Sequence, residues 1–312
     1  MTKPAQQRGV ALIIVLLILS IATVALVSMS SSRQLDIRRT ENLLRSAQAY
    51  EYLYSLESWA AKILRDERRE NNQDSLNDSW AEPLAKTAVP GGTMDARITD
   101  LQGRFNVNNL LVEDQPSALD VQRFRRLLAL LKIKPGITDA ILDWLDTDSA
   151  IRYPDGAEDE TYAQQQTPYR CANRPFADLG ELLSVYGITP EDYHKLAPYL
   201  YVAEGYQPMN INTAEPLLIR SLADQLSAKN TERLARAIKR QAFGDLEAFL
   251  QHDLVAAQGI DKLGLTVSSR HFLLSGTIQV GKIFLRFDSQ LKRLENGNIQ
   301  VLKRQRRSPE HG

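Results

Sequence analysis

Acidic side chains crowd into one short segment of this chain. Residues 139–160 hold eight carboxylates and a single basic side chain, Arg152. The eight are Asp139, Asp143, Asp146, Asp148, Asp155, Glu158, Asp159 and Glu160. Carboxylates this close repel one another unless water or a cation lies between them. Hard oxygen ligands in a loop that contains glycine suit Ca²⁺, which takes about six to eight oxygens. The segment therefore predicts either a calcium site or a solvated acidic loop.

The order of the acids suggests which of them meet. Asp146 and Asp148 are two residues apart, so alternate side chains of an irregular loop can converge on one ion. Glu158 and Asp159 can close the site from the far side of Gly156. The spacing does not match the twelve-residue loop of an EF-hand. Our first choices for metal ligands are Asp146, Asp148, Glu158 and Asp159.

The residue types give little support to other chemistry. The 4 histidines are scattered, and no two have the spacing of metal ligands. The lone Cys171 excludes an intrachain disulfide and a zinc site built from thiolates. The sequence has no glycine-rich phosphate loop and no nucleophile elbow. We expect no catalytic residue and no enzyme activity. A membrane-tethered, metal-dependent hydrolase is the enzymatic alternative.

Helical and extended patterns surround the acidic segment. Residues 147–174 show no period and predict a long loop, within a mainly helical region. The helices expected there include 138–146, 177–185, 190–200, 214–226 and 231–241. Apolar and polar residues alternate in 94–98, 266–280 and 283–291, as in half-buried strands. Asn296-Gly297 is a two-residue hairpin signal.

A long apolar stretch lies close to the N-terminus. A short basic leader ends at Gly9, and the stretch from Val10 to Val27 carries no charge. About 20 apolar residues in a helix cross a bilayer core. A secretory signal has its cleavage site after the apolar stretch, whereas the small-residue junction here precedes it. No Pro or Gly interrupts residues 10–70, which predicts one helix about 90 Å long. Its second half has an apolar stripe that must pack on a sheet.

This junction resembles the precursors of type IV pilins and pseudopilins, whose leader is removed by a peptidase. Most members of that family carry Glu as the fifth mature residue, and Ile14 stands there in this chain. The minor pseudopilins that lack this Glu form the general secretion pathway protein K family of the type II secretion system. Residues 141–148, 156–162 and 168–176 also closely resemble the K family. A plain signal anchor is the alternative.

The resemblance implies an α+β, pilin-like fold, in which a long N-terminal helix packs on an antiparallel sheet. It also implies a large all-α insert that contains helix-hairpin-helix-like units. The expected divisions are a leader at 1–9, a transmembrane part at 10–32, pilin-like core at 33–111, the insert at 112–262 and C-terminal strands at 263–312.

The resemblance further implies a minor pseudopilin at the tip of the pseudopilus, which supports protein export. Prepilin peptidase would cleave between Gly9 and Val10, with N-methylation of Val10. Ile14 would mark the top subunit, because it offers no carboxylate to a neighbour above. Implied partners are the minor pseudopilins of the I and J types and the inner-membrane secretion machinery. The chain would cross the inner membrane once, with its bulk in the periplasm. Calcium is implied in the insert, where Asp146, Asp148, Glu158 and Asp159 are our ligands of choice.

A DNA-binding protein anchored in the membrane is the alternative function. Residues 130–141 and 182–190 resemble helix-hairpin-helix units, and residues 209–214 resemble the motif that precedes them. In the DNA-binding versions a second glycine lets backbone N–H groups approach phosphate, and Thr138 and Thr189 stand there instead. The acidic segment would also repel phosphate. Lys plus Arg equals Asp plus Glu, 38 each, so the net charge indicates no polyanionic partner.

Overall fold

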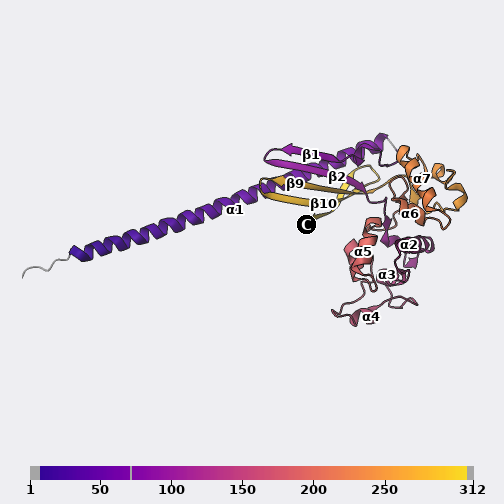
Figure 1. Cartoon of the computed structure of the whole chain (residues 1–312), viewed down its shortest axis with the longest axis horizontal. Helices are drawn as coiled ribbons and strands as arrows, with labels where there is room; N and C mark the ends of the chain where they lie inside the picture. The colour runs from indigo at the N-terminus through magenta and orange to yellow at the C-terminus, as the bar shows by residue number, and fades with distance from the viewer. Residues whose placement is uncertain (1–7, 71, 308–312) are drawn as a thin grey trace, which may run out of the picture.

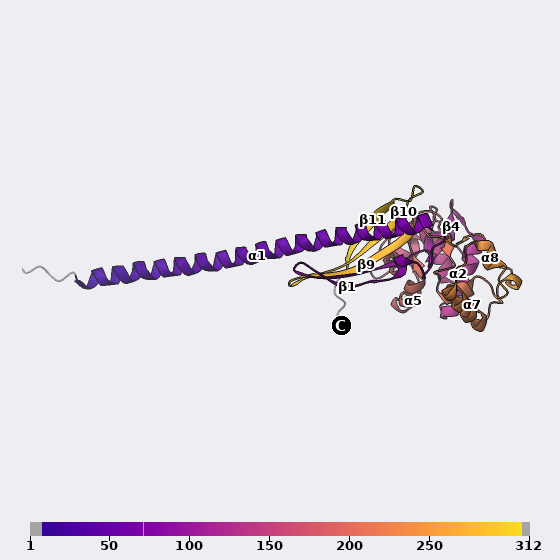
Figure 2. The same ribbon diagram turned by 90° about the horizontal axis from the view of Figure 1, so that it is seen from above.

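A helix of 63 residues dominates the shape of the molecule. The computed structural model describes residues 8–70 and 72–307, and in it α1 runs unbroken from Arg8 to Glu70. At 1.5 Å per residue this helix is about 95 Å long. Figures 1 and 2 show its first half projecting free and its second half lying along a sheet. The expected helix is present and begins two residues before Val10.

The second half of α1 lies on a five-stranded antiparallel sheet. The strand order is β1-β2-β9-β10-β11. The bounds are Leu84–Val89, Gly92–Asp100, His271–Val280, Ile283–Arg293 and Ile299–Arg307. Successive side chains of a strand point to opposite faces, so one face of the sheet packs against α1. The core between them includes Leu53, Leu56, Ala60, Ile98, Phe272, Leu274 and Phe287. The long helix on an antiparallel sheet, expected from the sequence, is confirmed.

The chain leaves the sheet after β2 and returns at β9, and the residues between form a mainly helical insert. Its first half contains β3 (Phe105–Asn106), η2 (Val107–Leu110), β4 (Leu111–Val112), β5 (Gln115–Pro116), α2 (Ala118–Leu131), α3 (Ile137–Leu145), α4 (Asp159–Ala163), η3 (Leu179–Ser184), α5 (Pro190–Leu196), η4 (Ala197–Tyr199) and β6 (Leu200–Tyr201). Its second half contains β7 (Met209–Asn210), α6 (Pro216–Ser221), α7 (Ala228–Arg240), α8 (Leu246–Leu250), η5 (Ala256–Gln258) and β8 (Leu265–Thr266). The short 3-10 helix η1 (Ser79–Ala81) precedes the sheet. One apolar core runs through both halves, where α2 packs on α6.

The two halves of the insert repeat the same backbone clamp. The Asn108 amide donates to the carbonyl of Phe176 at 3.1 Å and accepts from its N–H at 2.9 Å. Asn212 makes the same pair of bonds with Phe243, at 3.0 and 2.9 Å. The clamp closes 68 residues in the first half and 31 in the second. The first half is therefore longer between its clamped residues than the second half. Most of this difference is the loop after α3, which contains much of the acidic segment.

Some expected elements are shorter or of another kind. The helix expected at 177–185 is the 3-10 helix η3, and that expected at 214–226 is an α-helix only over Pro216–Ser221. The helix expected at 190–200 ends at Leu196 and continues as 3-10 helix η4. Pro198 lies in η4 and has no N–H to continue an α-helical ladder. The strand expected from 266 begins at His271, because Leu265–Thr266 pairs with β7 instead.

A buried polar junction joins the insert to the sheet. The carboxylate of Asp100, at the end of β2, accepts hydrogen bonds from the hydroxyls of Thr213 and Ser269, each at 2.6 Å. Burial raises the pKa of Asp100 to about 6, against the effect of these bonds. A second link ties β11 to the first half of the insert, through Lys303 and Asp178 at 2.7 Å.

Candidate functional site

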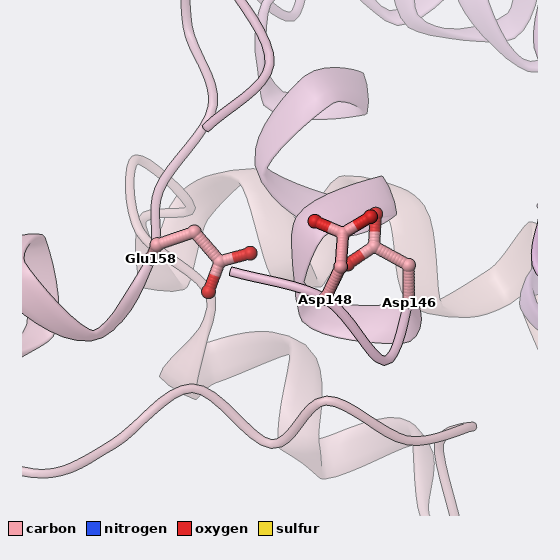
Figure 3. A group of neighbouring side chains, drawn as sticks. All are labelled: Asp146, Asp148 and Glu158. Atoms are coloured by element: carbon pink, nitrogen blue, oxygen red, sulfur yellow. The ribbon is translucent and has the colours of Figure 1, made fainter. Parts of the chain in front are cut away.

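Three carboxylates of the acidic segment meet in space. Asp146 and Asp148 directly follow α3, and Glu158 comes from the other end of the loop, immediately before α4. One oxygen from each carboxylate lies within 4.8 Å of the others. Figure 3 shows Glu158 facing the two aspartates across a short gap. The loop thus folds back so that its two ends present their acids to one point.

An aromatic cluster fixes the two ends of this loop. Trp144, in the last turn of α3, stacks on Phe176 with ring centroids 6.3 Å apart. Trp144 also packs edge-to-face with Tyr162 of α4, with ring centroids 5.4 Å apart. Because Trp144 stands two residues before Asp146 and Tyr162 four residues after Glu158, this packing holds the carboxylates together. Such aromatic pairs contribute about 0.5–1.5 kcal/mol beyond their buried area.

Several oxygens of the group have no hydrogen-bond partner within residues 8–70 and 72–307. They are Oδ1 of Asp146 and both carboxylate oxygens of Glu158. Asp146 is 1 % and Glu158 3 % exposed, while Asp148 is exposed to solvent. A buried carboxylate without a partner is costly, and a bound cation would supply what it lacks. These atoms therefore fit a hard divalent cation such as Ca²⁺.

Arg152 neutralises one side of the group. Its Nη2 lies 2.5 Å from Oδ2 of Asp146, and its Nε lies 3.2 Å from Oδ1 of Asp143. Asp146 thus has Oδ2 on Arg152, and its Oδ1 has no hydrogen-bond partner within the described residues. Our sequence reasoning missed this role of Arg152. The available signal was that Arg152 is the only base among the eight acids of the segment.

Burial sets the acidity of the buried members. Burial, and after it the nearby carboxylates with Asp143 first among them, raises the pKa of Glu158 to about 7. Burial likewise raises the pKa of Asp143 to about 6 and raises that of Asp146, against the effect of Arg152. A cation at this point would act in the opposite direction, because it favours the charged form of each acid.

Gly156 allows the loop to pass close to Asp143. A Cβ atom at this position would lie 2.3 Å from Oδ2 of Asp143 and 2.4 Å from the carbonyl oxygen of Arg152. Both distances are far below an ordinary contact, so a side chain here would displace the loop or the aspartate. The return of the loop toward α3 therefore depends on glycine at this position.

The fourth expected ligand lies apart from the group. Oδ1 of Asp159 accepts a hydrogen bond from the N–H of Cys171, which follows α4, at 2.9 Å. The structure therefore brings together Asp146, Asp148 and Glu158, while Asp159 fastens the chain beyond α4.

The N-terminal half of α1 is the other candidate site. From Val10 to Val27 every side chain is exposed, and Ile14 is 50 % exposed. Among the residues that the structure describes, α1 is the one helix long and apolar enough to cross a membrane. Gly9 lies inside the first turn of this helix. A helix that is apolar all round and packs on nothing needs either lipid or other helices around it.

Comparison with known families and proteins gives consistent matches. A family model described as "Type II secretion system (T2SS), protein K" matches residues 103–205. "Type II secretion system protein K" of Pseudomonas aeruginosa is 31% identical over 309 residues, which cover 96% of this chain and 92% of that protein. The protein of the same description from Aeromonas hydrophila is 32% identical over 323 residues, which cover 96% of this chain and 97% of that protein.

A solved structure matches at the level of the fold. It is a chain of "The Crystal Structure of the GspK-GspI-GspJ complex from enterotoxigenic Escherichia coli Type 2 Secretion System". The TM-score is 0.75 at 27% sequence identity, and the match covers 87% of this chain and 100% of that chain. The likeness therefore extends to the insert as well as to the helix and sheet.

Proposed function

The chain belongs to the type II secretion system protein K family and is a minor pseudopilin with a single membrane anchor, and from this premise we propose that it caps the pseudopilus. The observation that carries the proposal is the side chain of Ile14, which offers no carboxylate on an otherwise pilin-like α1. A carboxylate at that depth would need a partner, because an unpaired one is costly in lipid. A subunit without this carboxylate needs no pairing partner in a subunit above it.

The proposed partners are minor pseudopilins of the I and J types. The structural neighbour comes from a complex with GspI and GspJ, and its fold covers most of this chain. The exposed apolar surface of α1 between Val10 and Leu44 offers such partners a helix to pack on. The role is one of assembly and requires no catalytic group of this chain.

We further propose that the chain sits in the inner membrane with its sheet and insert in the periplasm. Prepilin peptidase would cut between Gly9 and Val10 and methylate Val10. The support is the position of the small residue before the apolar stretch, which leaves the anchor on the mature protein. DNA binding receives no support from the relatives reported above, which are secretion proteins.

Calcium is the proposed ligand of the acidic loop. Asp146, Asp148 and Glu158 would hold the ion, with Asp159 outside the group that the fold assembles. Bound calcium would supply positive charge to the partnerless oxygens. Trp144 and Tyr162 would hold the two ends of the loop together. Arg152 pairs with Oδ2 of Asp146, which leaves Oδ1 of that residue for the ion.

The decisive experiment is purification of the tagged chain from a host that expresses the I-type and J-type subunits, with and without prepilin peptidase. We expect co-purification of both subunits and, only when the peptidase is present, a mature mass that starts at Val10. A chain that purifies alone and starts at Met1 in both hosts would overturn the proposal.

A further inference from the structure

One face of α7 carries a stripe of positive charge. Arg233, Arg236 and Arg240 are exposed and recur at steps of three and four, so they lie along one side of the helix. Leu234 and Ile238 on the opposite side are buried in the insert core. Like charges at these spacings destabilise a helix. Arg240 complements the helix dipole in the last turn, but this does not account for Arg233 and Arg236.

The stripe borders a groove. The groove has a volume of about 440 Å³ and lies between α7 and the turn that follows α8. We use the name basic groove for the space lined by Arg233, Arg236, Arg240, His252, Asp253 and Leu254. No ion pair links its arginines to a carboxylate within the described part of the chain, whereas Arg126 of α2 is paired with Asp224 at 2.6 Å. The groove thus presents guanidinium groups with free donors.

His252 is oriented by its surroundings. Its Nδ1 accepts a hydrogen bond from the N–H of Leu254 at 3.2 Å, and its ring packs edge-to-face with Phe243, with centroids 5.6 Å apart. With Nδ1 used as an acceptor, the proton of the neutral ring lies on Nε2, which becomes a donor. Asp253 is exposed and is the one acceptor among the charged side chains of the groove. The lining therefore combines several donors with one carboxylate.

We propose that the basic groove binds a short acidic segment of another protein. The planar guanidinium of arginine can donate two parallel hydrogen bonds to one carboxylate, so Arg233 and Arg236 would bind acidic side chains of the segment. The carboxylate of Asp253 would accept a hydrogen bond from a backbone N–H of the same segment. A phosphodiester chain or a lipid phosphate has acceptors only and would be repelled by Asp253, so the mixed lining favours a peptide.

The place of the groove agrees with this choice. Figure 1 places α7 at the end of the molecule opposite the start of α1. Residues 33–70 of α1 alone span about 57 Å, which separates the groove from a membrane that holds the apolar stretch. The headgroups of that membrane are therefore out of reach, while a soluble protein or a neighbouring subunit is not. The proposal goes beyond the assembly role and does not depend on it.

The test uses the full chain in non-ionic detergent. A fluorescein-labelled peptide of alternating Glu and Ser is titrated by anisotropy, beside the same peptide with Gln for Glu. We expect binding of the Glu peptide only, weakened as ionic strength rises because salt screens exposed charges. The double variant Arg233→Gln/Arg236→Gln should weaken binding about tenfold, as expected for the loss of two solvent-exposed ion pairs.

Matched variants distinguish this site from general charge attraction. Lys134→Gln/Lys262→Gln removes the same charge from exposed positions elsewhere on the insert and should leave binding within about twofold. Asp253→Asn should weaken binding of the peptide and strengthen binding of duplex DNA. Equal losses in the two double variants, no binding of the Glu peptide at low salt, or tighter binding of duplex DNA than of the peptide would each overturn the proposal.

Discussion

Asp74 and Arg293 form a buried ion pair through both arms of the guanidinium, with Nη1 2.8 Å and Nη2 2.9 Å from the two carboxylate oxygens. Their side chains are 2 % and 4 % exposed. Arg293 also donates to the carbonyls of Leu64 and Ser269, at 3.0 and 2.9 Å. One side chain at the end of β10 thus holds the end of α1, the loop after it and the return from the insert.

Removing one partner of this pair should destabilise the protein strongly. We expect Arg293→Met to cost about 3–5 kcal/mol, because Asp74 is then left buried without its cation. Lys195→Met breaks the exposed pair with Glu191 and should change the stability far less, because solvent screens that pair. Thermal unfolding of the full chain, followed by circular dichroism, compares the two. Similar losses in both variants would contradict this role of Arg293.

Calcium should stabilise the protein through Glu158. At a calcium concentration about 100 times the Kd, the expected gain is about 2.7 kcal/mol. Glu158→Gln should abolish the gain. Glu160→Gln, an exposed acid two residues away and outside the group, should keep it. Tm is measured in EDTA and in excess calcium. Retention of the full gain in Glu158→Gln would remove Glu158 from the ligand set.

Acidification should stabilise the calcium-free protein. The pKa of Glu158 is about 7 in the folded chain against a usual 4.5, so between these values the folded state binds more protons than the unfolded state. Stability then falls as pH rises through this window and levels off above it. Asp100 and Asp143, with pKa values of about 6, contribute in the same direction.

Substitution of Glu158 gives this pH dependence a direct check. In EDTA, Glu158→Gln should be more stable than the parent above pH 7, because it removes a buried charge, and the advantage should vanish near pH 4.5. Unfolding in urea at a series of pH values provides the curve. Parallel curves for the two proteins would show that Glu158 does not titrate in this window.

Gly156→Ala should damage the acidic loop specifically. Its Cβ would lie 2.3 Å from Asp143 Oδ2, so the loop must shift and separate Glu158 from the two aspartates. We expect a calcium affinity at least about tenfold weaker, as for other losses in the support of metal ligands. Gly244→Ala has its nearest atom at 3.8 Å and serves as the control. Calorimetric titration measures both variants, and equal affinities would refute the packing argument.

Ile14→Glu should alter the fibre without altering the fold. The new carboxylate can pair with a subunit above, so we expect longer fibres in which this subunit is no longer confined to the end. Ile13→Glu introduces the same charge one position earlier, on another face of α1, and should not have this effect. Fibre length by electron microscopy and subunit composition by mass spectrometry give the readout. Unchanged fibres would count against a capping role.

The parts of the fold that follow a local period could be predicted from the sequence. The unbroken helix α1, the alternating strands and a turn at Asn296-Gly297 each depend on residues close in the chain. The two-residue hairpin loop expected there is wrong, because residues 294–298 join β10 to β11. The acidic segment was also evident, because eight like charges in one stretch demand an explanation. The choice of Asp146, Asp148, Glu158 and Asp159 followed from the same stretch, and the fold brings the first three together.

What the sequence did not reveal depends on contacts between distant residues. Asp74 and Arg293 are 219 positions apart, and the clamp of Asn108 on Phe176 spans 68. Neither pairing leaves a local period, since Asp74 and Phe176 lie in irregular backbone, Asn108 in the short 3-10 helix η2 and Arg293 at a strand end. Asp159 could not be separated from Glu158 in advance, because its hydrogen bond to Cys171 exists only after the loop has folded back.

The continuous path of α1 from Arg8 to Glu70 makes this subunit a lever. Its sheet and insert are fastened to the far end of a rod about 95 Å long, with no hinge residue between that end and the apolar stretch. A change of only about 5° in the tilt of the rod would swing the far end by about 8 Å. Any movement imposed on the anchor would therefore reach the basic groove and the acidic loop as a displacement of several ångströms.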